Sequence, residues 1–471
     1  MHSSTPQQLA TLLLIFALWV SSAIAQDQTE NQPAGTSAQI EGTDTDTAET
    51  DQEAQQKQKE KNADIREAVL ENLDLKKATQ EYEDTPVDPP QEGAGQITQD
   101  EEDPDSVKDE DEWYYRFSAV ADRMQNIPYL SDRGWLHFGR IELEYGHFFK
   151  SELLEDDSGF NFRSLRSGII KLFDNGMIVK LDIDLTDGDS NFTDLYVRFS
   201  TKLGLFTLGN QKVALSLVNQ TSRLARTFME EPLPSEAFGL SRRLGLGWDF
   251  HRKKVGVHLT AFGPDLNTGI GKFGYGLRMY TNPKLTRWSL AHIGVSGVRE
   301  EMDRDARFRA RPETRITDTY LVNTRTVTAV ESQSIFGLEA AAAHRNWSIR
   351  GEYFYTEWER NNQNNINFTG YYAQASWVLT GESFQYKEGR FLRIRPDSSK
   401  GAWELALRYS AIDLNDQNIF GGAEKNTTLA LNWYSPGMQL RIQSNLIYVN
   451  TDAVAGNVDP LILQVRAQLN W

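Results

Sequence analysis

The 471-residue chain contains no cysteine. This absence excludes a disulfide scaffold, a thiolate metal site and a lipid-modified cysteine, and it suits an exported protein. The seven histidines show no metal-site spacing, and no GxSxG nucleophile motif occurs. Only one long apolar run is present, and the mean hydropathy of −0.53 argues against a bundle of membrane helices. We therefore expect no enzyme activity, no metal and no cofactor.

The first 25 residues contain no Lys, Arg, Asp or Glu. The apolar run LATLLLIFALWVSSAIA (residues 9–25) ends in Ala23-Ile24-Ala25, a pattern typical of signal peptidase cleavage. Its apolar core is too short to span a bilayer comfortably. We expect residues 1–25 to be a signal peptide that is removed before Gln26. The start of the segment lacks the usual positive charge, and a membrane anchor is the alternative interpretation.

Residues 26–112 carry most of the negative charge of the chain. They hold 27 Asp and Glu and 7 Lys and Arg, a net of −20, whereas the whole chain has a net charge of −17. Residues 113–471 therefore carry a net charge of about +3. The acidic composition and the scarcity of aromatic residues predict a largely disordered leader. Residues 61–82 space apolar side chains at three or four positions, which predicts a short helix within it.

Residues 113–471 repeatedly alternate apolar and polar side chains. In the last eleven residues, LILQVRAQLNW, an apolar series from Leu461 to Trp471 lies on one face of a strand, opposite a mostly polar series. The pattern recurs, with charged residues on the polar face, in residues 177–185, 193–199, 244–250, 347–355, 403–410 and 437–443. Closing such strands into a barrel removes the sheet edges and turns the apolar face toward lipid, while the polar face lines water.

Turn signals divide this region into strands. Short turns such as Asp174-Asn175-Gly176 and Asn282-Pro283-Lys284 alternate with longer polar stretches. The longer stretches are residues 151–160, 188–191, 211–241, 263–271, 298–331, 359–366, 412–424 and 451–457. Eight loops predict an all-β, sixteen-stranded antiparallel transmembrane barrel over 113–471, with short periplasmic turns, long extracellular loops and an aqueous channel. Residues 380–400 are unusually long for a periplasmic turn, and the leader 26–112 would be periplasmic.

Several stretches resemble the phosphate-selective porin O/P family. They include WLHFGRIELEYGHF (135–148), DNGMIVKLDIDLTDGDSNFTDLYVRFS (174–200), residues 208–248 and, most specifically, YYAQASWVLTGESFQYKEGRFLRIRPDSSKGAWELALRYSAIDLN (371–415). The resemblance runs from about Gly134 to Trp471 and excludes the leader. It implies a sixteen-stranded outer-membrane barrel, usually a homotrimer, with a third loop folded into the lumen.

The resemblance also implies partners. A last strand that ends in an aromatic residue resembles the signal read by the outer-membrane assembly machinery, although most members end in Phe and this chain ends in Trp471. Outer-membrane lipid, lipopolysaccharide and small anionic solutes are further expected partners. Nucleic acid is not expected, because the chain is acidic, exported and without a basic domain.

The charges on the predicted inward faces do not favour one sign, because nine bases oppose nine acids. Selectivity then depends on a local excess at the constriction, which we expect in the third loop, residues 211–241. The residues expected to face the channel and bind anions there are Lys212, Arg223, Arg226, Arg242, Arg243 and, on a preceding strand, Arg198. Guanidinium groups bind phosphate or carboxylate with two hydrogen bonds. The alternative is that the arginines pair with neighbouring glutamates and hold the loop against the wall.

A departure from the family pattern bears on phosphate. Family members that bind phosphate line the lumen at this loop with lysines and arginines. Here TSRLAR (221–226) keeps two arginines, but the following EEPLPSE is acidic and has no lysine. This departure weakens the expectation of strict phosphate specificity.

A second basic run, ARFRAR (306–311), lies in the fifth predicted loop. Arg309 and Arg311 are two positions apart and would share one strand face at the pore mouth or contact lipopolysaccharide phosphates. Acidic residues surround the run, so a solvated loop is the alternative.

We interpret the chain as an outer-membrane porin for passive diffusion of small solutes, with a preference for anions such as phosphate. One alternative is a general or cation-tolerant porin. Another is a secreted all-β binding or hydrolytic protein, which would be soluble without detergent, whereas a barrel stays folded in detergent.

Overall fold

The computed structural model describes residues 134–149, 158–173, 175–186, 191–252, 254–269, 271–286, 289–452 and 459–471. The predicted signal peptide (1–25), acidic leader (26–112) and helix (61–82) lie outside the described residues and stay predictions. Among the described residues, no helix is long and apolar enough to cross a bilayer.

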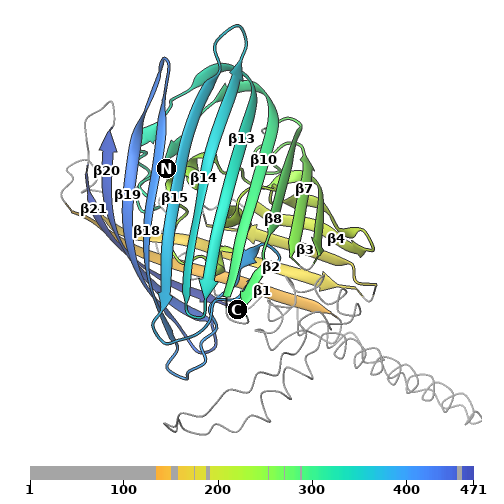
Figure 1. Cartoon of the computed structure of the whole chain (residues 1–471), viewed down its shortest axis with the longest axis vertical. Coiled ribbons are helices and arrows are strands. Elements are labelled where there is room, and N and C mark those ends of the chain that lie inside the picture. The colour runs from red at the N-terminus through yellow and green to blue at the C-terminus, as the bar shows by residue number, and fades with distance from the viewer. Residues whose placement is uncertain are drawn as a thin grey trace, which may run out of the picture. The chain divides into compact units, whose positions relative to one another are not determined.

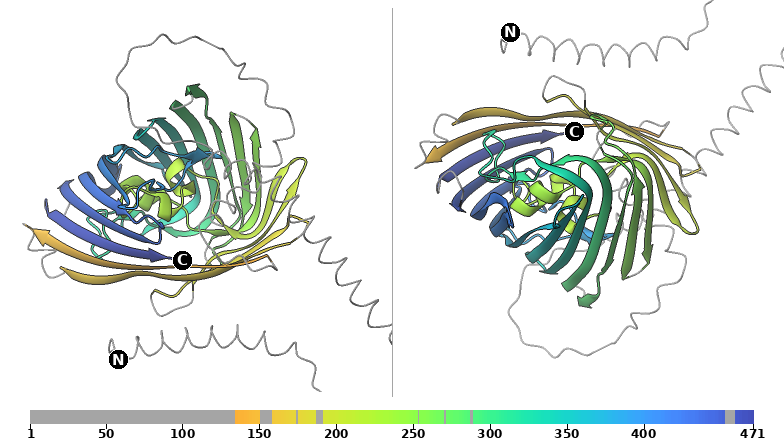
Figure 2. Two further views of the ribbon diagram at one scale, coloured as in Figure 1. Left: turned by 90° about the horizontal axis from the view of Figure 1, so that it is seen from below. Right: turned by 90° about the horizontal axis from the view of Figure 1, so that it is seen from above.

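Sixteen long strands in the described part form one antiparallel sheet that closes into a barrel, as predicted (Figures 1 and 2). The first and last strands pair from Arg140↔Asn470 to Phe149↔Leu461. This pairing closes the sheet, so the strands form a barrel and not an open β-sandwich. A short strand, β9 (Lys284–Thr286), precedes β10. The sixteen strands are β1 (Trp135–Phe149), β2 (Gly159–Leu172), β3 (Ile178–Asp184), β4 (Asn191–Thr201), β5 (Gly204–Gln211), β6 (Arg243–Arg252), β7 (Val255–Phe262), β8 (Gly274–Thr281), β10 (Ser289–Ala306), β13 (Val327–His344), β14 (Trp347–Arg360), β15 (Ile366–Val378), β18 (Ala402–Asp416), β19 (Ile419–Tyr434), β20 (Leu440–Asp452) and β21 (Leu461–Asn470).

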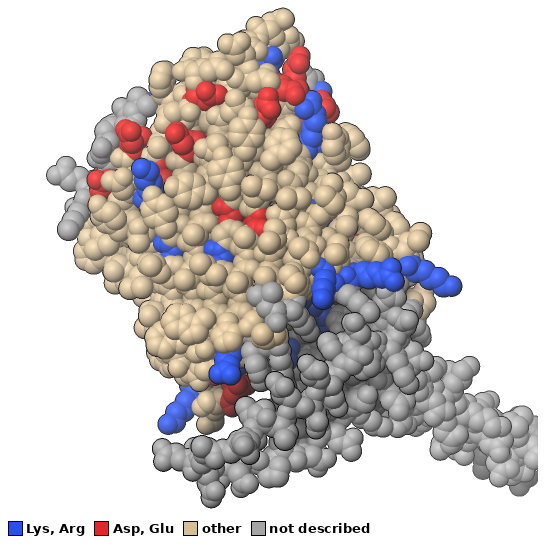
Figure 3. Space-filling view, in the orientation of Figure 1, with Lys and Arg blue, Asp and Glu red and all other residues tan. Residues whose placement is uncertain are grey.

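The two faces of the strands follow the alternation in the sequence. On β21, Val465 and Leu469 are 38% and 47% exposed on the outside, whereas Arg466 between them is 1% exposed inside. The outer wall in Figure 3 is mostly uncharged, and its acidic side chains gather mainly toward the extracellular end. This distribution fits a wall whose middle faces hydrocarbon.

Tryptophans mark the periplasmic end of the wall. Trp135, Trp377 and Trp403 lie on the outer face at strand ends and are 37–46% exposed, and the rings of Trp347 and Trp377 stack with their centroids 4.8 Å apart. Aromatic rings are favoured at the boundary between hydrocarbon and water. These positions therefore place one membrane boundary at the short turns.

Two extracellular loops are shorter than predicted. Residues 298–331 were expected to be one loop, but β10 continues to Ala306 and β13 begins at Val327, with Arg299 opposite Ser334. Residues 412–424 were also expected to be a loop, but β18 and β19 leave only a tight turn at 417–418. Both predictions were wrong because strand ends above the hydrocarbon are polar on their outer face, so polarity alone does not distinguish them from a loop.

The long periplasmic segment, residues 379–401, folds into the barrel. It contains the short hairpin β16 (Tyr386–Lys387) and β17 (Arg390–Phe391). The carbonyl of Gly389 accepts a hydrogen bond from Arg278 Nη2 at 2.7 Å, and the Tyr386 hydroxyl lies 2.5 Å from His292 Nδ1. Because Arg278 and His292 point inward from β8 and β10, this segment occupies the lumen from the periplasmic side.

Part of the inner wall is apolar, which differs from the polar lining predicted. Between the extracellular halves of β10 and β18, buried apolar side chains form one cluster with the third and fifth loops. The fifth loop, residues 307–326, contains β11 (Arg309–Ala310) and β12 (Val322–Asn323). Its Phe308 stacks on Trp358 of β14 with ring centroids 4.3 Å apart. The barrel therefore has a packed core on one side, which attaches both loops to the wall.

The seam between β1 and β21 provides a test of closure. Gly139 and Trp471 exchange backbone hydrogen bonds of 3.0 and 3.2 Å, and a Cβ on Gly139 would lie 2.1 Å from Trp471 Cζ2. We predict that Gly139→Ala displaces the indole and lowers the free energy of unfolding by about 1–3 kcal/mol, measured by urea unfolding in lipid vesicles. The matched control is Gly297→Ala, where the nearest atom would be 3.8 Å away. Equal stability of the two variants would contradict the packing of Trp471 on this seam.

The candidate channel constriction

The third loop, L3 (residues 212–242), lies inside the barrel, as predicted (Figure 2). It contains α5 (Leu217–Gln220), the 3-10 turn η4 (Arg223–Ala225) and α6 (Leu233–Phe238). Ser216 accepts a hydrogen bond from the Asn219 amide at 3.1 Å and caps α5, and Pro232 precedes α6. These local signals divide L3 into short turns that follow the curved inner wall.

Carboxylates on the wall hold two points of L3. Both oxygens of Glu352 on β14 accept hydrogen bonds of 2.8 Å from the amides of Leu217 and Val218. Glu404 on β18 accepts a hydrogen bond from Thr227 Oγ1 at 3.0 Å. The amides at the start of a helix have no intrahelical partner, so Glu352 supplies the acceptor that α5 lacks.

Arginines on the wall hold the same loop through its carbonyl groups. Arg408 of β18 donates to the Glu230 carbonyl at 3.0 Å, and Arg441 of β20 donates to the Arg226 carbonyl at 2.6 Å. Arg466 of β21 donates to the Met229 carbonyl at 2.7 Å. Three strands, β18, β20 and β21, therefore bind one short stretch of L3 backbone.

Glu230 is the main ionic anchor of L3. Its carboxylate accepts hydrogen bonds from Arg163 of β2 at 2.8 and 3.1 Å and from Arg466. Arg223 and Arg315 lie 3.4 and 3.7 Å from it. Burial alone would raise the pKa of Glu230, but the surrounding arginines outweigh this effect and hold the pKa well below its usual range. Glu230 is therefore ionised over the physiological pH range.

The arginines predicted in and after L3 all pair with carboxylates. Arg226 lies 2.6 Å from Glu231, and Arg242 lies 2.5 Å from Asp194 of β4. Arg243, at the start of β6, lies 3.5 Å from Glu300. Arg223 lies 3.5 Å from Glu142 of β1, in addition to its contact with Glu230. The structure thus brings these residues together at L3. Their ion pairs are also the contacts expected under the alternative interpretation, in which the arginines hold the loop against the wall.

Lys212 and Arg198 each lack an ion pair of their own among the described residues. Lys212 Nζ donates to the carbonyls of Asn219 and Thr221 within L3. Burial, followed by the nearby charges of Arg226 and Arg242, holds the pKa of Lys212 well below its usual range. Arg198 donates to Thr207 Oγ1 at 2.9 Å.

Arg309 and Arg311 share one face, as their spacing predicts, and both stack on Tyr320. Their guanidinium carbons lie 3.9 and 4.3 Å from the ring centroid. Arg311 also reaches Glu236 of L3 at 3.4 Å, which joins L3 to the fifth loop. Only Arg311 of this pair therefore contacts the constriction loop.

Most ion pairs at L3 share an asymmetry in the exposure of their two side chains to water. The Arg163 side chain is 18% exposed against 6% for Glu230, and Arg242 is 25% exposed against 12% for Asp194. The pairs Arg223–Glu142 (15% and 0%), Arg315–Glu236 (36% and 7%) and Arg390–Glu388 (28% and 6%) show the same order. The order is reversed at L3 in Arg226–Glu231 (14% and 27%) and Arg466–Glu230 (1% and 6%), and away from L3 in Arg299–Glu359 (31% and 40%). In most pairs at L3 the guanidinium is nevertheless the more exposed partner.

Arg163 and Arg166 of β2 were missed by the sequence reasoning. They are three residues apart, so a strict period of two would place them on opposite faces. A register shift opposite Glu142 and Leu143 of β1 turns both inward, where Arg163 meets Glu230 and Arg166 meets Asp184 at 2.8 Å. No simple pattern in the sequence marks this bulge.

A closed sixteen-stranded barrel with a loop inside its lumen is the architecture of outer-membrane porins, which are channels for passive diffusion. The chain belongs to the phosphate-selective porin O and P family, whose family model matches residues 138–471.

Two curated relatives are similar in sequence. An uncharacterised protein of Caulobacter vibrioides is 30% identical over 338 residues, which cover 67% of this chain and 68% of the relative. Porin O of Pseudomonas aeruginosa is 33% identical over 141 residues, covering 27% of this chain and 32% of Porin O. The family match and the barrel fold support an outer-membrane location.

Solved structures that are similar to this chain have lower sequence identity. An anion-selective porin from Comamonas acidovorans has a TM-score of 0.48 at 12% identity, covering 72% of this chain and 99% of that one. A loop-deletion mutant of OmpT from Vibrio cholerae has a TM-score of 0.49 at 14% identity, with the same coverages.

Glu236 of L3 is a buried carboxyl group that lies 3.4 Å from both Arg311 and Arg315. Burial raises its pKa to about 7, although Arg315 and Arg311 oppose the rise. Because this pKa is above that of the unfolded chain, ionisation of Glu236 weakens the fold as the pH rises through about 7. Protonation at lower pH leaves the charges of Arg315 and Arg311 uncompensated by Glu236.

We therefore predict that lowering the pH from 8 to 6 raises the ratio of anion to cation permeability, measured from zero-current potentials in planar bilayers. Glu236→Gln should remove most of this change and resemble the wild type at low pH. A pH response that persists unchanged in Glu236→Gln would contradict this assignment.

Proposed function

We propose that this porin favours small anions, phosphate among them. The asymmetry of the lumen ion pairs is the observation that carries this proposal. A passing ion interacts first with the more exposed partner of each pair, and in most pairs at L3 that partner is an arginine. The near balance of charges along the chain therefore does not imply a neutral channel surface.

The distribution of these groups supports a preference rather than tight binding. Arg163, Arg223 and Arg242 each keep a carboxylate partner, which reduces the positive potential that a free arginine would produce. Guanidinium groups still offer donors to phosphate, chloride or a carboxylate that passes. An ion that is attracted without being fully neutralised leaves again quickly, which rapid conduction requires.

We assign the predicted cations to this role in the following way. Lys212, Arg198, Arg223, Arg226, Arg242 and Arg243 act at L3, and Arg309 and Arg311 act at the extracellular entrance. Burial lowers the pKa of Lys212, so this side chain contributes less positive charge than the arginines do. We add Arg163, Arg166 and Arg315 to these cations, because their side chains point into the barrel and contact Glu230 or Asp184.

We further propose the biogenesis and assembly that the sequence predicts. The signal peptide 1–25 is cleaved on export, and the assembly machinery recognises the last strand at Trp471. The barrel assembles as a homotrimer among outer-membrane lipid and lipopolysaccharide, with the leader 26–112 in the periplasm. The position of Trp471 on the outer face, 38% exposed, supports the role of the last strand.

Zero-current potentials in a KCl gradient across planar bilayers test the proposed selectivity. We predict a potential of the sign that anion preference produces, and a loss of about two- to fivefold in the permeability ratio for Arg242→Gln, because one partly screened charge is removed. The matched control is Arg360→Gln at the extracellular end of β14, where Arg360 donates to the Asn364 carbonyl. Cation preference of the wild type would overturn the proposal, and equal permeabilities would support a general porin instead.

A further inference from the structure

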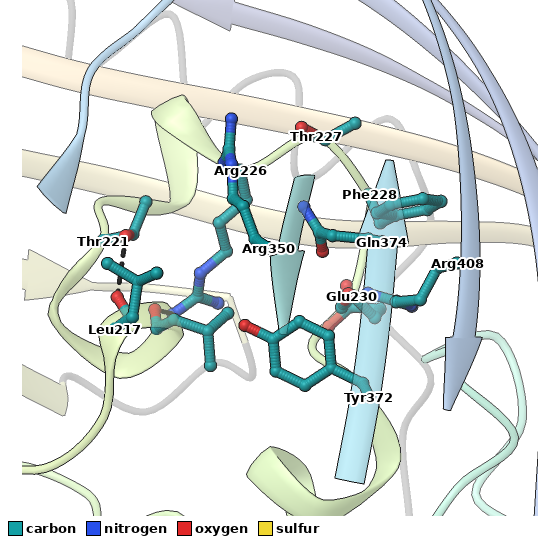
Figure 4. A pocket seen from close by; sticks show the side chains of 11 residues that line it. Leu217, Thr221, Arg226, Thr227, Phe228, Glu230, Arg350, Tyr372, Gln374 and Arg408 are labelled. Atoms are coloured by element: carbon teal, nitrogen blue, oxygen red, sulfur yellow. Dashed lines mark hydrogen bonds between the residues drawn. The ribbon is translucent and has the colours of Figure 1, made fainter. Parts of the chain in front are cut away.

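The space beside L3 is too small to hold a solute (Figure 4). It is lined by Arg226 of L3, Arg350 of β14 and Arg408 of β18, together with the carboxylate of Glu230. Its volume of about 20 Å³ has room for about one water molecule. A peptide segment that competes with passing ions therefore acts outside this space, at a mouth of the channel.

The connections at the two ends of the barrel carry opposite charge. The periplasmic connections between the sixteen strands hold 11 Lys and Arg against 4 Asp and Glu, a net charge of +7. They are residues 173–177, 202–203, 253–254, 282–288, 345–346, 379–401 and 435–439. The extracellular connections other than L3 and the fifth loop hold 2 Lys and Arg against 8 Asp and Glu. Figure 3 shows this polarity, with acidic side chains mainly toward one end and basic side chains projecting at the other.

The basic side chains of the periplasmic end are more exposed than most of the acidic ones. Glu382 is 4% exposed, and the Glu388 side chain is 6% exposed against 28% for its partner Arg390. Exposed cations of the described turns and adjoining strand ends are Lys202, Arg252, Lys254, Arg345 and Lys400. A polyanion that approaches from the periplasm therefore meets mainly lysine and arginine.

Part of this positive charge lies inside the mouth. The hairpin β16–β17 contains Lys387 and Arg390, and Arg278 holds it within the lumen through the Gly389 carbonyl at 2.7 Å. Further along the same segment, Arg393 donates to the Met438 carbonyl. A flexible peptide can reach groups inside the mouth, whereas headgroups of the lipid around the outer wall cannot. This placement favours a peptide over lipid as the partner of the basic mouth.

The chain itself contains a segment of matching charge. Residues 100–112, DEEDPDSVKDEDE, hold nine Asp and Glu and one Lys, a net charge of −8. Residues 113–133 connect this acidic run to Gly134, where the described barrel begins. The Gly134 carbonyl accepts a hydrogen bond from the Leu172 amide at 2.9 Å, beside the turn 173–177. The acidic run is therefore attached to the end of the barrel that carries the basic turns.

The connection is long enough for the acidic run to reach the mouth. A chain of 21 residues spans at most about 70 Å, and a flexible one has an end-to-end distance of about 25 Å. Such a tether gives an effective concentration in the millimolar range, so a weak attraction is sufficient for binding. The attraction depends on salt, because the screening length falls from about 10 Å at 0.1 M to about 3 Å at 1 M.

We propose that residues 100–112 dock against the basic periplasmic mouth, formed by the periplasmic turns and the segment 379–401. The docked carboxylates neutralise the lysines and arginines there and lower the local concentration of small anions. The acidic run is thus a built-in competitor of permeating anions that acts at low ionic strength. This effect on permeation rests on the proposed anion preference, whereas the docking itself does not.

Carbodiimide crosslinking of the mature chain, residues 26–471, tests the contact. The reagent joins a carboxylate to a lysine amine where the two touch, and mass spectrometry identifies the pair. For the folded barrel in detergent at about 0.1 M salt, we expect links from residues 100–112 to Lys202, Lys254 or Lys400, and their loss at about 1 M salt. Links from the acidic run to lysines of the leader alone, or no links, would overturn the docking.

Zero-current potentials in phosphatidylcholine bilayers test the effect on permeation. One variant replaces the nine Asp and Glu of residues 100–112 by Asn and Gln. Its anion-to-cation permeability ratio should exceed that of the wild type about twofold in 0.1 M KCl and equal it in 1 M KCl, because salt screens the acidic run. The control variant neutralises the seven Asp and Glu of residues 41–60, further from the barrel, and should behave as the wild type. Heat-modifiable migration on gels checks that each variant is folded.

The outcomes separate this inference from the proposed function. Equal effects of the two variants, or no effect of either, would overturn the role of residues 100–112. A permeability ratio that responds to added phosphatidylglycerol, and not to neutralisation of the acidic run, would assign the basic mouth to lipid headgroups and also overturn it. Cation preference of the neutralised variant in 1 M KCl would contradict the proposed function, while the crosslinks still decide the docking.

Discussion

The structure depends on how the inner wall satisfies the backbone of L3. A loop that leaves the wall and enters the lumen exposes amide and carbonyl groups that a strand would pair. Here Glu352 accepts from two amides at the start of α5, while Arg408, Arg441 and Arg466 donate to carbonyls further along the loop. These contacts are charge-assisted and largely buried, so they are stronger than ordinary loop hydrogen bonds. They hold the loop at a defined position inside the lumen.

The same contacts determine the electrical character of the lumen. Carboxylates such as Glu142 and Glu230 are buried because they hold arginines or loop segments in place. Their arginine partners have longer side chains and reach further into the water-filled space. Anchoring the loop and presenting positive charge are therefore two consequences of one arrangement. Arg350 of β14 departs from this arrangement, because none of the described carboxylates forms an ion pair with it and its Nη2 makes only a 3.4 Å hydrogen bond to Ser348.

The strand pattern made most of the fold predictable. The alternation from Leu461 to Trp471, and in the other strands, correctly predicted which side chains point outward and which point into the barrel. It did so because lipid on one side and water on the other impose a period of two. The same reasoning failed at residues 298–331 and 412–424, where the strands extend beyond the hydrocarbon and lose their apolar face. It also failed at Arg163 and Arg166, which a bulge brings to one side.

The details of the constriction were less predictable. Glu144 and Arg466 are 322 positions apart and meet only because β1 pairs with β21. Glu230 lies in an acidic stretch that weakened the expectation of phosphate specificity, yet it organises arginines from three parts of the chain. Pairing partners at such separations follow from strand order and register, which local residue patterns do not encode.

Amide hydrogen exchange of the folded barrel in detergent tests the anchoring of L3 most directly. The amides of Leu217 and Val218 donate to Glu352, and the amide of Leu233 donates to Ser410 Oγ of β18 at 2.9 Å. If the wall holds the loop in this way, these three amides exchange slowly, at rates comparable to those of strands β14 and β18. Exchange of these three amides at the rate of an unprotected peptide, while the strands stay protected, would contradict the account.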